Sequence, residues 1–305
     1  MQMKNLNKSL VAGWIAVGIS TVITCFWAFW GMIENFHEGW YSTSWLSNVG
    51  LMFVQYLSPM LIFMVAALIS IFLPRFGGIL HVVLAVFAVW FFQAISNPGL
   101  FLLIAPMVGL GALYWFGRLQ PRKLAVLVVF GLPMLTLIFS GIEPIWRVSQ
   151  RFDDGNLQAR VVLGDGVELI WAPDGPGWPR SGANWHEAQK TCQQLSENGL
   201  SLAQNPQYIW RLPSADEAVR SMSRHDQNSS GQWDAGLAQA SYKIKPDKVS
   251  PLWNIHSQVI YWWTATEVDE DRAYMIVYDG QVWPRSKQIR PAYLGFRCVK
   301  QPDQD

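Results

Sequence analysis

Charged residues are distributed very unevenly along this chain of 305 residues. The first 141 residues hold eight Lys, Arg, Asp or Glu side chains, namely Lys4, Lys8, Glu34, Glu38, Arg75, Arg118, Arg122 and Lys123. The other 17 Lys/Arg and 20 Asp/Glu all follow residue 141. Long uncharged stretches are typical of a membrane segment, whereas the later composition is that of a water-soluble domain. We therefore predict a membrane domain over 1–141, a linker over 142–160 and a soluble domain over 161–305.

The membrane domain divides into five apolar runs separated by short Gly/Pro-rich or basic linkers. These runs cover residues 10–30, 49–73, 79–95, 100–116 and 124–140. Each has about 17 to 25 residues, the length that crosses the hydrocarbon core of a bilayer. We predict a bundle of five transmembrane helices. The runs over 79–95 and 100–116 also fit a re-entrant hairpin, which would return the chain to the same side.

The charges of the membrane domain predict its orientation. With five spans, all of its Lys and Arg residues fall on one side, and the opposite side carries Glu34 and Glu38. The positive-inside rule then places the amino terminus in the cytoplasm and the soluble domain on the other side. The net charge of +1 and the absence of a basic stripe in the sequence argue against a nucleic-acid partner.

The soluble domain shows helix starts and strands in a definite order. Capping boxes begin two helices, one at Asn184 with Glu187 and one at Ser214 with Glu217. We expect irregular structure over 223–250, because its residues are polar and typical of loops. The predicted strands cover residues 160–163, 167–172, 208–212, 259–266, 273–278, 281–283 and 294–299.

Two cysteines of the soluble domain are predicted to be bonded. Cys192 shares one helix face with Trp185, Ala188 and Leu195, so it points into a core. Cys298 alternates with charged Arg297 in the last predicted strand and also faces inward. A disulfide between them would persist in an oxidising compartment, in agreement with the predicted orientation.

The order of several short motifs resembles a known family. These motifs are Leu169-Ile170-Trp171-Ala172, Trp185 with Ala188 and Cys192, Trp210-Arg211-Leu212-Pro213-Ser214 with Glu217, Tyr261 to Glu267 (YWWTATE), and Gly295-Phe296-Arg297-Cys298. Together they are similar to bacterial domains related to formylglycine-generating enzyme and sulfatase-modifying factors. The resemblance covers residues 161–300 and implies an α+β domain of the C-type lectin-like fold.

The resemblance also bears on catalysis. Catalytic members of the family bind copper with a pair of active-site cysteines, but Cys25 lies in a membrane run, and Cys192 and Cys298 match the structural bridge. Related iron enzymes use a clustered H-x-x-x-H-x-E motif, whereas His186, His225 and His256 are widely separated. The resemblance therefore implies a non-catalytic domain without a resident cofactor.

Tryptophan is unusually frequent after residue 141, with ten of the 17 in the chain. Because this is more than one core needs, we expect some of them at a surface that binds a protein partner or a glycan. The candidates for such contacts are Trp253, Trp262, Trp263 and Trp283, together with Arg211 and Arg297. The two arginines are also expected to brace the fold by pairing with Glu217 or another carboxylate.

Candidate metal ligands are few. Glu267, Asp269 and Asp271 lie in one predicted loop and could hold calcium through their oxygens, but a solvated acidic turn is the favoured interpretation. Glu34 and His37 form a single E-x-x-H spacing, for which a polar loop is favoured over half of a di-metal centre. His81 is expected to reach the lipid headgroups rather than to bind haem.

These observations predict a multi-pass protein of a bacterial inner membrane with a periplasmic C-terminal domain. Its expected role is that of an accessory or scaffold subunit, which binds another membrane or periplasmic protein, or a glycan. The alternative is an enzyme of the sulfatase-modifying class that acts on a protein or a small thiol.

Overall fold

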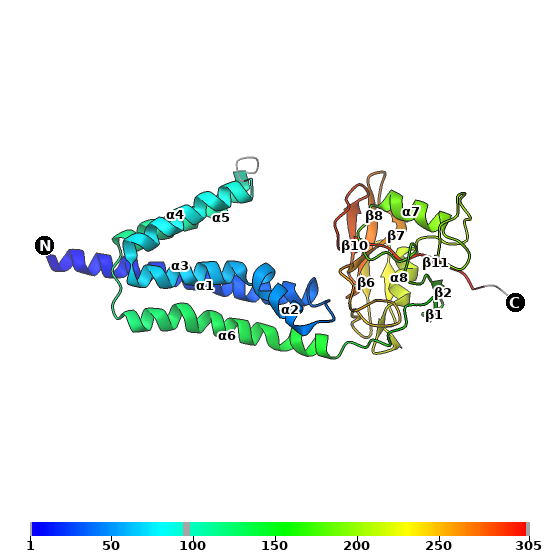
Figure 1. Ribbon diagram of the computed structural model, residues 1–305, viewed down its shortest axis with the longest axis horizontal. Coiled ribbons are helices and arrows are strands. Elements are labelled where there is room, and N and C mark those ends of the chain that lie inside the picture. The colour runs from blue at the N-terminus through cyan, green and yellow to red at the C-terminus, as the bar shows by residue number, and fades with distance from the viewer. Residues whose placement is uncertain (1, 94–97, 303–305) are drawn as a thin grey trace. The chain divides into compact units, whose positions relative to one another are not determined.

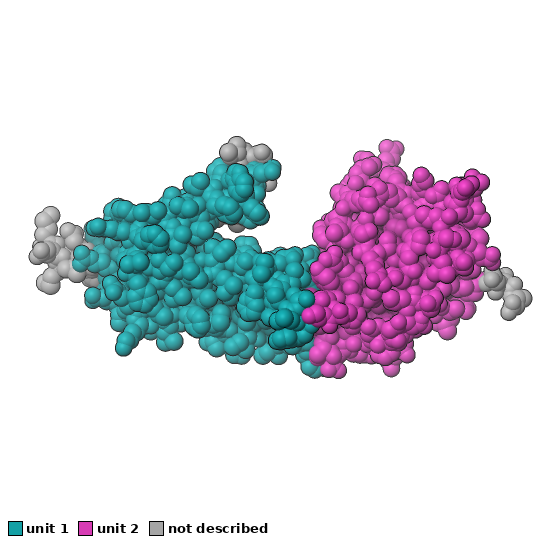
Figure 2. Space-filling view, in the orientation of Figure 1, with its two compact units in different colours: residues 1–39, 45–146 teal, residues 40–44, 147–305 magenta. Residues whose placement is uncertain are grey.

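The computed structural model describes residues 2–93 and 98–302. The chain forms two compact units, shown in different colours in Figure 2. The membrane unit comprises Met1–Gly39 and Trp45–Trp146, and the C-terminal unit comprises Trp40–Ser44 and Arg147–Asp305. The short segment Trp40–Ser44 groups with the C-terminal unit because Tyr41 contacts it: Gln258 Nε2 donates to Tyr41 Oη at 2.5 Å.

The described part of the membrane unit is helical (Figure 1). Its elements are α1 (Gln2–His37), α2 (Trp45–Leu51), the π-helix η1 (Met52–Tyr56), α3 (Ser58–Phe72), α4 (Pro74–Phe91), the 3-10 turn η2 (Pro98–Leu100), α5 (Phe101–Phe116) and α6 (Arg122–Ser149). Helix α1 continues through residues 31–37, which we expected to be a loop, and α6 continues through 142–149, which we expected to be linker.

By length and composition, three helices can cross a membrane: α1, α4 and α6. A fourth span results if the segment formed by α2 and η1 is counted together with α3, although these two segments are bent by 61° relative to each other. Helix α5 is apolar but shorter. The described residues thus support a membrane protein with three or four membrane-capable helices, where five spans were predicted.

Small residues allow close packing within the bundle. A Cβ atom on Gly78 of α4 would lie 2.7 Å from the Gly111 carbonyl of α5, and one on Gly111 would lie 2.8 Å from the Gly78 carbonyl. Helix α1 is equally close to the end of α5, because a Cβ on Gly13 would lie 2.4 Å from the Arg118 carbonyl. Side chains with a Cβ at these positions would push the helices apart, so glycine determines how closely they approach.

His81 lies in the interior of the bundle, and the expected headgroup contact is wrong. The side chain is fully buried, with Nδ1 2.8 Å from the Gly77 carbonyl and its ring 5.3 Å from that of Tyr114. Tyr114 Oη in turn lies 3.0 Å from Ser20 Oγ. The reason is helical phase, since His81 shares one face of α4 with Gly77, Gly78 and Ala85, which are also buried.

Up to residue 302, the C-terminal unit contains two main sheets and two short helices. Strands β1 (Arg160–Leu163), β2 (Glu168–Trp171) and β11 (Val299–Lys300) form an antiparallel sheet in the order β1-β2-β11. Strands β7 (Tyr261–Glu267), β8 (Arg272–Val277), β9 (Val282–Ser286) and β10 (Leu294–Gly295) form the second, in the order β10-β7-β8-β9. In it β10 runs parallel to β7, and the other pairs are antiparallel.

Three expectations about strands need correction. Residues 223–250 contain two small hairpins rather than irregular structure alone: β3 (Ser223–Arg224) with β4 (Gln227–Asn228), and β5 (Gln232–Asp234) with β6 (Gln239–Ser241). The predicted strand over 208–212 is reduced to a single bridge between Arg211 and Val299. The last predicted strand, 294–299, is split into β10 and β11, which join different sheets.

Both predicted helix starts are confirmed as capping boxes. In α7 (Trp185–Gln194), Asn184 Oδ1 accepts from the Glu187 N–H at 2.9 Å and Glu187 Oε2 accepts from the Asn184 N–H at 3.1 Å. In α8 (Ala215–Ser221), Ser214 and Glu217 make the same reciprocal pair. These bonds satisfy backbone donors that a helix start would otherwise leave unpaired.

The predicted disulfide is confirmed. Cys192 on α7 is bonded to Cys298, with their Cα atoms 5.6 Å apart and a sequence separation of 106. Both side chains are fully buried in the core beside Trp185 and Ala188. The bond therefore connects the first helix of the C-terminal unit to its last segment.

Candidate functional site

Three of the four tryptophans predicted to contact a ligand belong to the core instead. Trp253, Trp262 and Trp263 are at most 2% exposed. The rings of Trp253 and Trp262 stack with centroids 3.6 Å apart, and Trp263 Nε1 donates to the Ala183 carbonyl at 2.8 Å. Strand β7 carries the pair Trp262-Trp263 and is paired at both edges, by β8 and β10, and its residues Tyr261 to Thr264 are buried on both faces of the sheet. A ligand cannot reach these rings without unfolding the domain.

Arg297 is a structural residue beside this tryptophan cluster. Its guanidinium is fully buried and lies 3.6 Å from the ring centroid of Trp178. It donates to the carbonyls of Ala172, Pro251 and Leu252. Burial lowers its pKa well below the ordinary value, and the charge of Arg160 acts in the same direction, although a guanidinium stays protonated. The expected bracing role holds, but backbone carbonyls take the place of the expected carboxylate.

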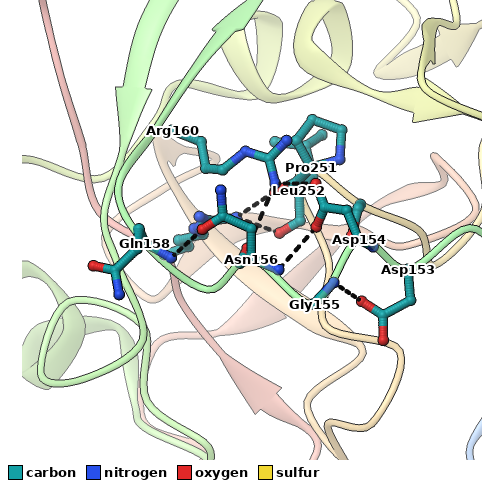
Figure 3. A network of polar contacts seen from close by, with 10 residues as sticks. Asp153, Asp154, Gly155, Asn156, Gln158, Arg160, Pro251 and Leu252 are labelled. Atoms are coloured by element: carbon teal, nitrogen blue, oxygen red, sulfur yellow. Dashed lines mark hydrogen bonds and ion pairs between the residues drawn. The ribbon is translucent and has the colours of Figure 1, made fainter.

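A second polar network lies where the chain enters the C-terminal unit (Figure 3). Asp153, Asp154 and Asn156 each accept a hydrogen bond from the N–H two residues later, at 3.0 Å. Arg160 pairs with Asp154 through Nη1. Burial acts to raise the pKa of Asp154, but hydrogen bonds from Arg160 and the Asn156 N–H lower it below its ordinary value. These oxygens are therefore engaged in turns of their own segment.

Arg211 also has a structural partner, as expected. Its Nη1 and Nη2 donate to Glu217 Oε2 and Oε1 at 2.7 Å and 2.6 Å, a two-pronged pair. Burial acts to raise the pKa of Glu217, but bonds from Arg211 and the Ser214 N–H lower it overall. The pair fixes the start of α8 and leaves Arg211 few free donors for a ligand.

The acidic loop between β7 and β8 is organised around a lysine. Lys287 Nζ donates to Glu267 Oε2 at 2.5 Å and to the carbonyls of Asp269 and Glu270, each at 2.8 Å. The Asp269 carboxylate turns to Arg272, with Nη2 2.6 Å from Oδ2, and it also accepts from the Asp271 N–H. Thus an ammonium group already fills the place where these oxygens would surround a cation. Calcium binding by this loop stays a prediction without support from the geometry.

Among residues 2–93 and 98–302, no group of three His, Cys, Asp or Glu side chains is arranged to hold a metal ion. The histidines of the C-terminal unit have separate neighbours. His186 packs edge-on against Trp185, His225 accepts from Arg224, and His256 Nε2 lies 3.6 Å from Asp153.

Trp283 is the candidate tryptophan that reaches the surface. Its side chain on β9 is 36% exposed, and the guanidinium of Arg285 lies 5.5 Å from the ring centroid. Tyr261, which is largely buried, lies next to it with centroids 6.5 Å apart, and Tyr261 also contacts the exposed ring of Tyr293. An aromatic and basic surface of modest size therefore surrounds Trp283.

A larger apolar surface lies at the end of α7. Leu200, Leu202, Tyr208 and Ile209 are 57%, 50%, 73% and 38% exposed, respectively. We call these four residues the α7-loop surface. The loop returns twice to the last turn of α7, because Ala203 N–H donates to the Gln194 carbonyl and Tyr208 N–H donates to the Gln193 carbonyl. Residues separated in sequence are thereby gathered at one end of one helix.

Tyr208 is held in an unusual backbone conformation. Its φ angle is +57°, a region that non-glycine residues seldom occupy and that costs about 1 to 2 kcal/mol. This reversal turns Tyr208 outward while Trp210 and Leu212, two and four residues later, are buried. A strand over 208–212, as predicted, would instead have put these three side chains on one face, because side chains alternate along a strand. The sequence signal that could have revealed this surface is the group of large apolar residues within 200–209.

Comparisons with protein-family models, with curated proteins and with solved structures find no match for this chain.

Proposed function

We propose that the chain is an integral membrane accessory subunit whose C-terminal unit binds a protein partner through the α7-loop surface. The observation that carries this proposal is the exposure of Leu200, Leu202, Tyr208 and Ile209 within one short loop. Scattered exposed apolar residues are ordinary, but four large ones within ten residues of one loop favour a surface that another molecule covers.

The chemistry of this surface favours a protein as the partner. Tyrosine is among the residues that contribute most at protein interfaces, because it combines a large apolar ring with a hydroxyl group and few rotatable bonds. Complete burial of one large apolar side chain is worth about 1.5 to 3 kcal/mol. Two leucines, an isoleucine and a strained tyrosine therefore offer an energetic centre for an interface. The backbone hydrogen bonds between the loop and α7 restrain the loop and so reduce the entropy lost on binding.

We further propose that the C-terminal unit is a catalytically silent member of the group related to formylglycine-generating enzyme, with a C-type lectin-like fold. The supporting observations are the order of its motifs, its two capped helices, and the bond between α7 and the last segment. This arrangement, a small antiparallel sheet fastened to a helix, is what the resemblance implies. The enzyme of the sulfatase-modifying class is the alternative.

The proposed location is the inner membrane of a bacterium, with five spans, a cytoplasmic amino terminus and a periplasmic C-terminal unit. Two independent features support this location. A buried structural disulfide favours an oxidising compartment, and with five spans the basic residues of the membrane unit would fall on the opposite side. Single cysteines introduced at Lys123 and Leu237 in a Cys25→Ser chain test it. A membrane-impermeant maleimide should label Leu237→Cys in spheroplasts, and Lys123→Cys only after lysis.

Trp283 favours a second candidate, a glycan ligand. An exposed indole with a neighbouring arginine can stack against a sugar ring and bond to its hydroxyls. The two functions use different residues, so one set of variants separates them.

The experiment is quantitative co-purification of the intact chain from cells after mild detergent extraction. The double variant Leu202→Ser/Tyr208→Ala should lose its partner by at least about tenfold, as about 1.4 kcal/mol of interface energy implies. Leu237→Ser is a matched control, because Leu237 is 69% exposed but lies on the turn between β5 and β6. Trp283→Ala should also keep the protein partner. Retention of the partner by the double variant, or its loss from the control, would contradict the proposal.

A further inference from the structure

Two adjoining cavities lie on the surface of the membrane unit along α4 and α5. The first has a volume of about 420 Å³, and its lining includes Gly78, Val82, Val108, Gly111, Ala112 and Trp115. The glycines at its base bring α4 and α5 together, so the groove lies between two helices that are packed closely there. Its lining consists of apolar side chains and two glycines, so the groove suits a hydrocarbon chain.

The second cavity continues the first and has a different chemistry. Its volume is about 690 Å³, and it shares Trp115 and Phe116 with the first. Its lining also includes Arg75, at the start of α4, and Arg118, directly after α5. The apolar groove therefore ends at a mouth that carries two guanidinium groups.

The two arginines are available for an anion. Among the described residues neither guanidinium makes a hydrogen bond or an ion pair, and no Asp or Glu lines either cavity. The backbone of Arg118 is fixed against α1, because its N–H donates to the Ser9 carbonyl at 3.0 Å and Ser9 Oγ donates to the Phe116 carbonyl at 2.8 Å.

The acids of the membrane unit are too distant to neutralise this mouth. They are Glu34 on α1, Glu38 directly after it, and Glu143 on α6. Glu34 lies 25 residues further along its helix than Ser9, and Glu143 lies 21 residues further along its helix than Arg122. At 1.5 Å per residue of helix, these separations are roughly 37 Å and 31 Å. Interactions over such a distance are screened by salt.

We propose that these cavities form a binding site for one anionic phospholipid, with its phosphate between Arg75 and Arg118 and an acyl chain in the groove between α4 and α5. A phospholipid has an anionic head joined to an apolar tail, in the same order as the basic mouth and the apolar groove. Guanidinium groups match the geometry of phosphate oxygens, and basic pockets between transmembrane helices bind anionic headgroups. A partner helix would fill the groove but would leave both arginines unpaired.

The test uses the full chain, delipidated in mild detergent, and native mass spectrometry with added phosphatidylglycerol or phosphatidylcholine. The wild-type chain should retain phosphatidylglycerol in preference to phosphatidylcholine. Each arginine replaced should weaken retention about fivefold, so that Arg75→Gln/Arg118→Gln loses about 25-fold. The matched control is Arg122→Gln/Lys123→Gln, which removes the same charge from the next helix start but lies outside both cavities.

A second pair of variants tests the groove. Ala112→Trp should fill the groove and abolish lipid retention, whereas Val86→Trp, at an exposed position of α4 outside the cavities, should not.

Four outcomes would overturn the proposal. Equal loss of lipid in Arg75→Gln/Arg118→Gln and in Arg122→Gln/Lys123→Gln would favour general surface attraction. Displacement of phosphatidylglycerol by inorganic phosphate, with no effect of Ala112→Trp, would overturn it in favour of a soluble anion. Release of a protein by Ala112→Trp would assign the groove to a partner helix. The headgroup comparison on the wild-type chain requires no variant, and equal retention of both lipids would also overturn the proposal.

Discussion

Lys287 Nζ lies 2.5 Å from Glu267 Oε2, inside the acidic loop that follows strand β7. The lysine side chain is 3% exposed and the glutamate side chain is 52% exposed. A second attraction comes from the Trp185 ring, whose centroid lies 4.9 Å from the ammonium. The loop was a candidate calcium site by sequence, and the structure instead gives it an internal cation.

Replacement of Lys287 by methionine should destabilise the C-terminal unit. The carbonyls of Asp269 and Glu270 would lose their donor, which typically costs about 1 to 3 kcal/mol. Chemical denaturation of the full chain, followed by tryptophan fluorescence, measures this effect as a lower midpoint. Lys245→Met removes the same charge from an exposed position and should leave the midpoint unchanged. Equal midpoints for Lys287→Met and the wild-type chain would contradict the bracing role.

Removal of the disulfide should destabilise the same unit further. Cys192→Ala/Cys298→Ala opens a covalent loop of 106 residues, which should cost about 2 to 5 kcal/mol. The wild-type chain should show the same loss of stability when dithiothreitol is added, whereas the double variant should not respond to it. Cys25→Ser is the control for thiol effects in the membrane unit, because Cys25 is unbonded. A wild-type chain that is insensitive to reductant would argue against the bond.

The Arg211–Glu217 pair should make stability depend on pH. The pKa of Glu217 is lower in the folded chain than its ordinary value near 4.3, so its contribution is present above that pH and is lost as the pH falls through the folded pKa. Glu217→Gln keeps an acceptor for the Ser214 N–H but removes the charge. The stability difference between wild-type and Glu217→Gln should therefore be greatest near neutral pH and should shrink below about pH 4. A difference that is constant with pH would refute the ion-pair assignment.

Two replacements of Tyr208 should separate backbone strain from the loss of the side chain. Tyr208→Gly and Tyr208→Ala both remove the ring, but glycine accepts a φ of +57° without strain. The glycine variant should be about 1 kcal/mol more stable than the alanine variant, and both should bind the partner weakly. Thermal unfolding and co-purification are the two measurements. A less stable glycine variant would show that the strained conformation is absent in solution.

The tryptophans of the C-terminal unit should divide into core and surface residues. Trp262→Ala removes a fully buried ring that contacts three other tryptophans, and it should cost about 3 to 5 kcal/mol. Trp283→Ala removes a ring at the surface and should change stability by less than about 1 kcal/mol. Chemical unfolding curves of the two variants measure these changes in the free energy of unfolding. A comparable loss of stability for the two would contradict the burial seen here.

Local chemistry was sufficient to predict the features that depend on neighbouring residues. Asn184 with Glu187 and Ser214 with Glu217 begin helices because a capping box needs only four consecutive residues. Cys192 and Cys298 were paired correctly because the phase of one helix and of one extended segment points each side chain inward. The hairpin of β1 and β2 follows from its Gly-Asp-Gly turn.

Features that depend on distant packing could not be predicted in this way. Tryptophan content alone does not separate Trp262, which lies on the central strand β7 and stacks on Trp253, from Trp283 on the edge strand β9. The conformation of Tyr208 depends on how residues 200–209 return to α7, and no local pattern encodes it. Helical phase places His81 on the same face of α4 as Gly77 and Gly78, but that face is buried only because α5 approaches it closely.

The most direct test of the central claim is photo-crosslinking in intact cells from a photoreactive side chain placed at position 208. The account predicts one discrete adduct with another protein from position 208 and no such adduct from position 237, which is equally exposed but lies on the β5–β6 turn. The same adducts from both positions, or none from position 208 in a chain that folds and inserts normally, would contradict the assignment of the α7-loop surface as the docking site.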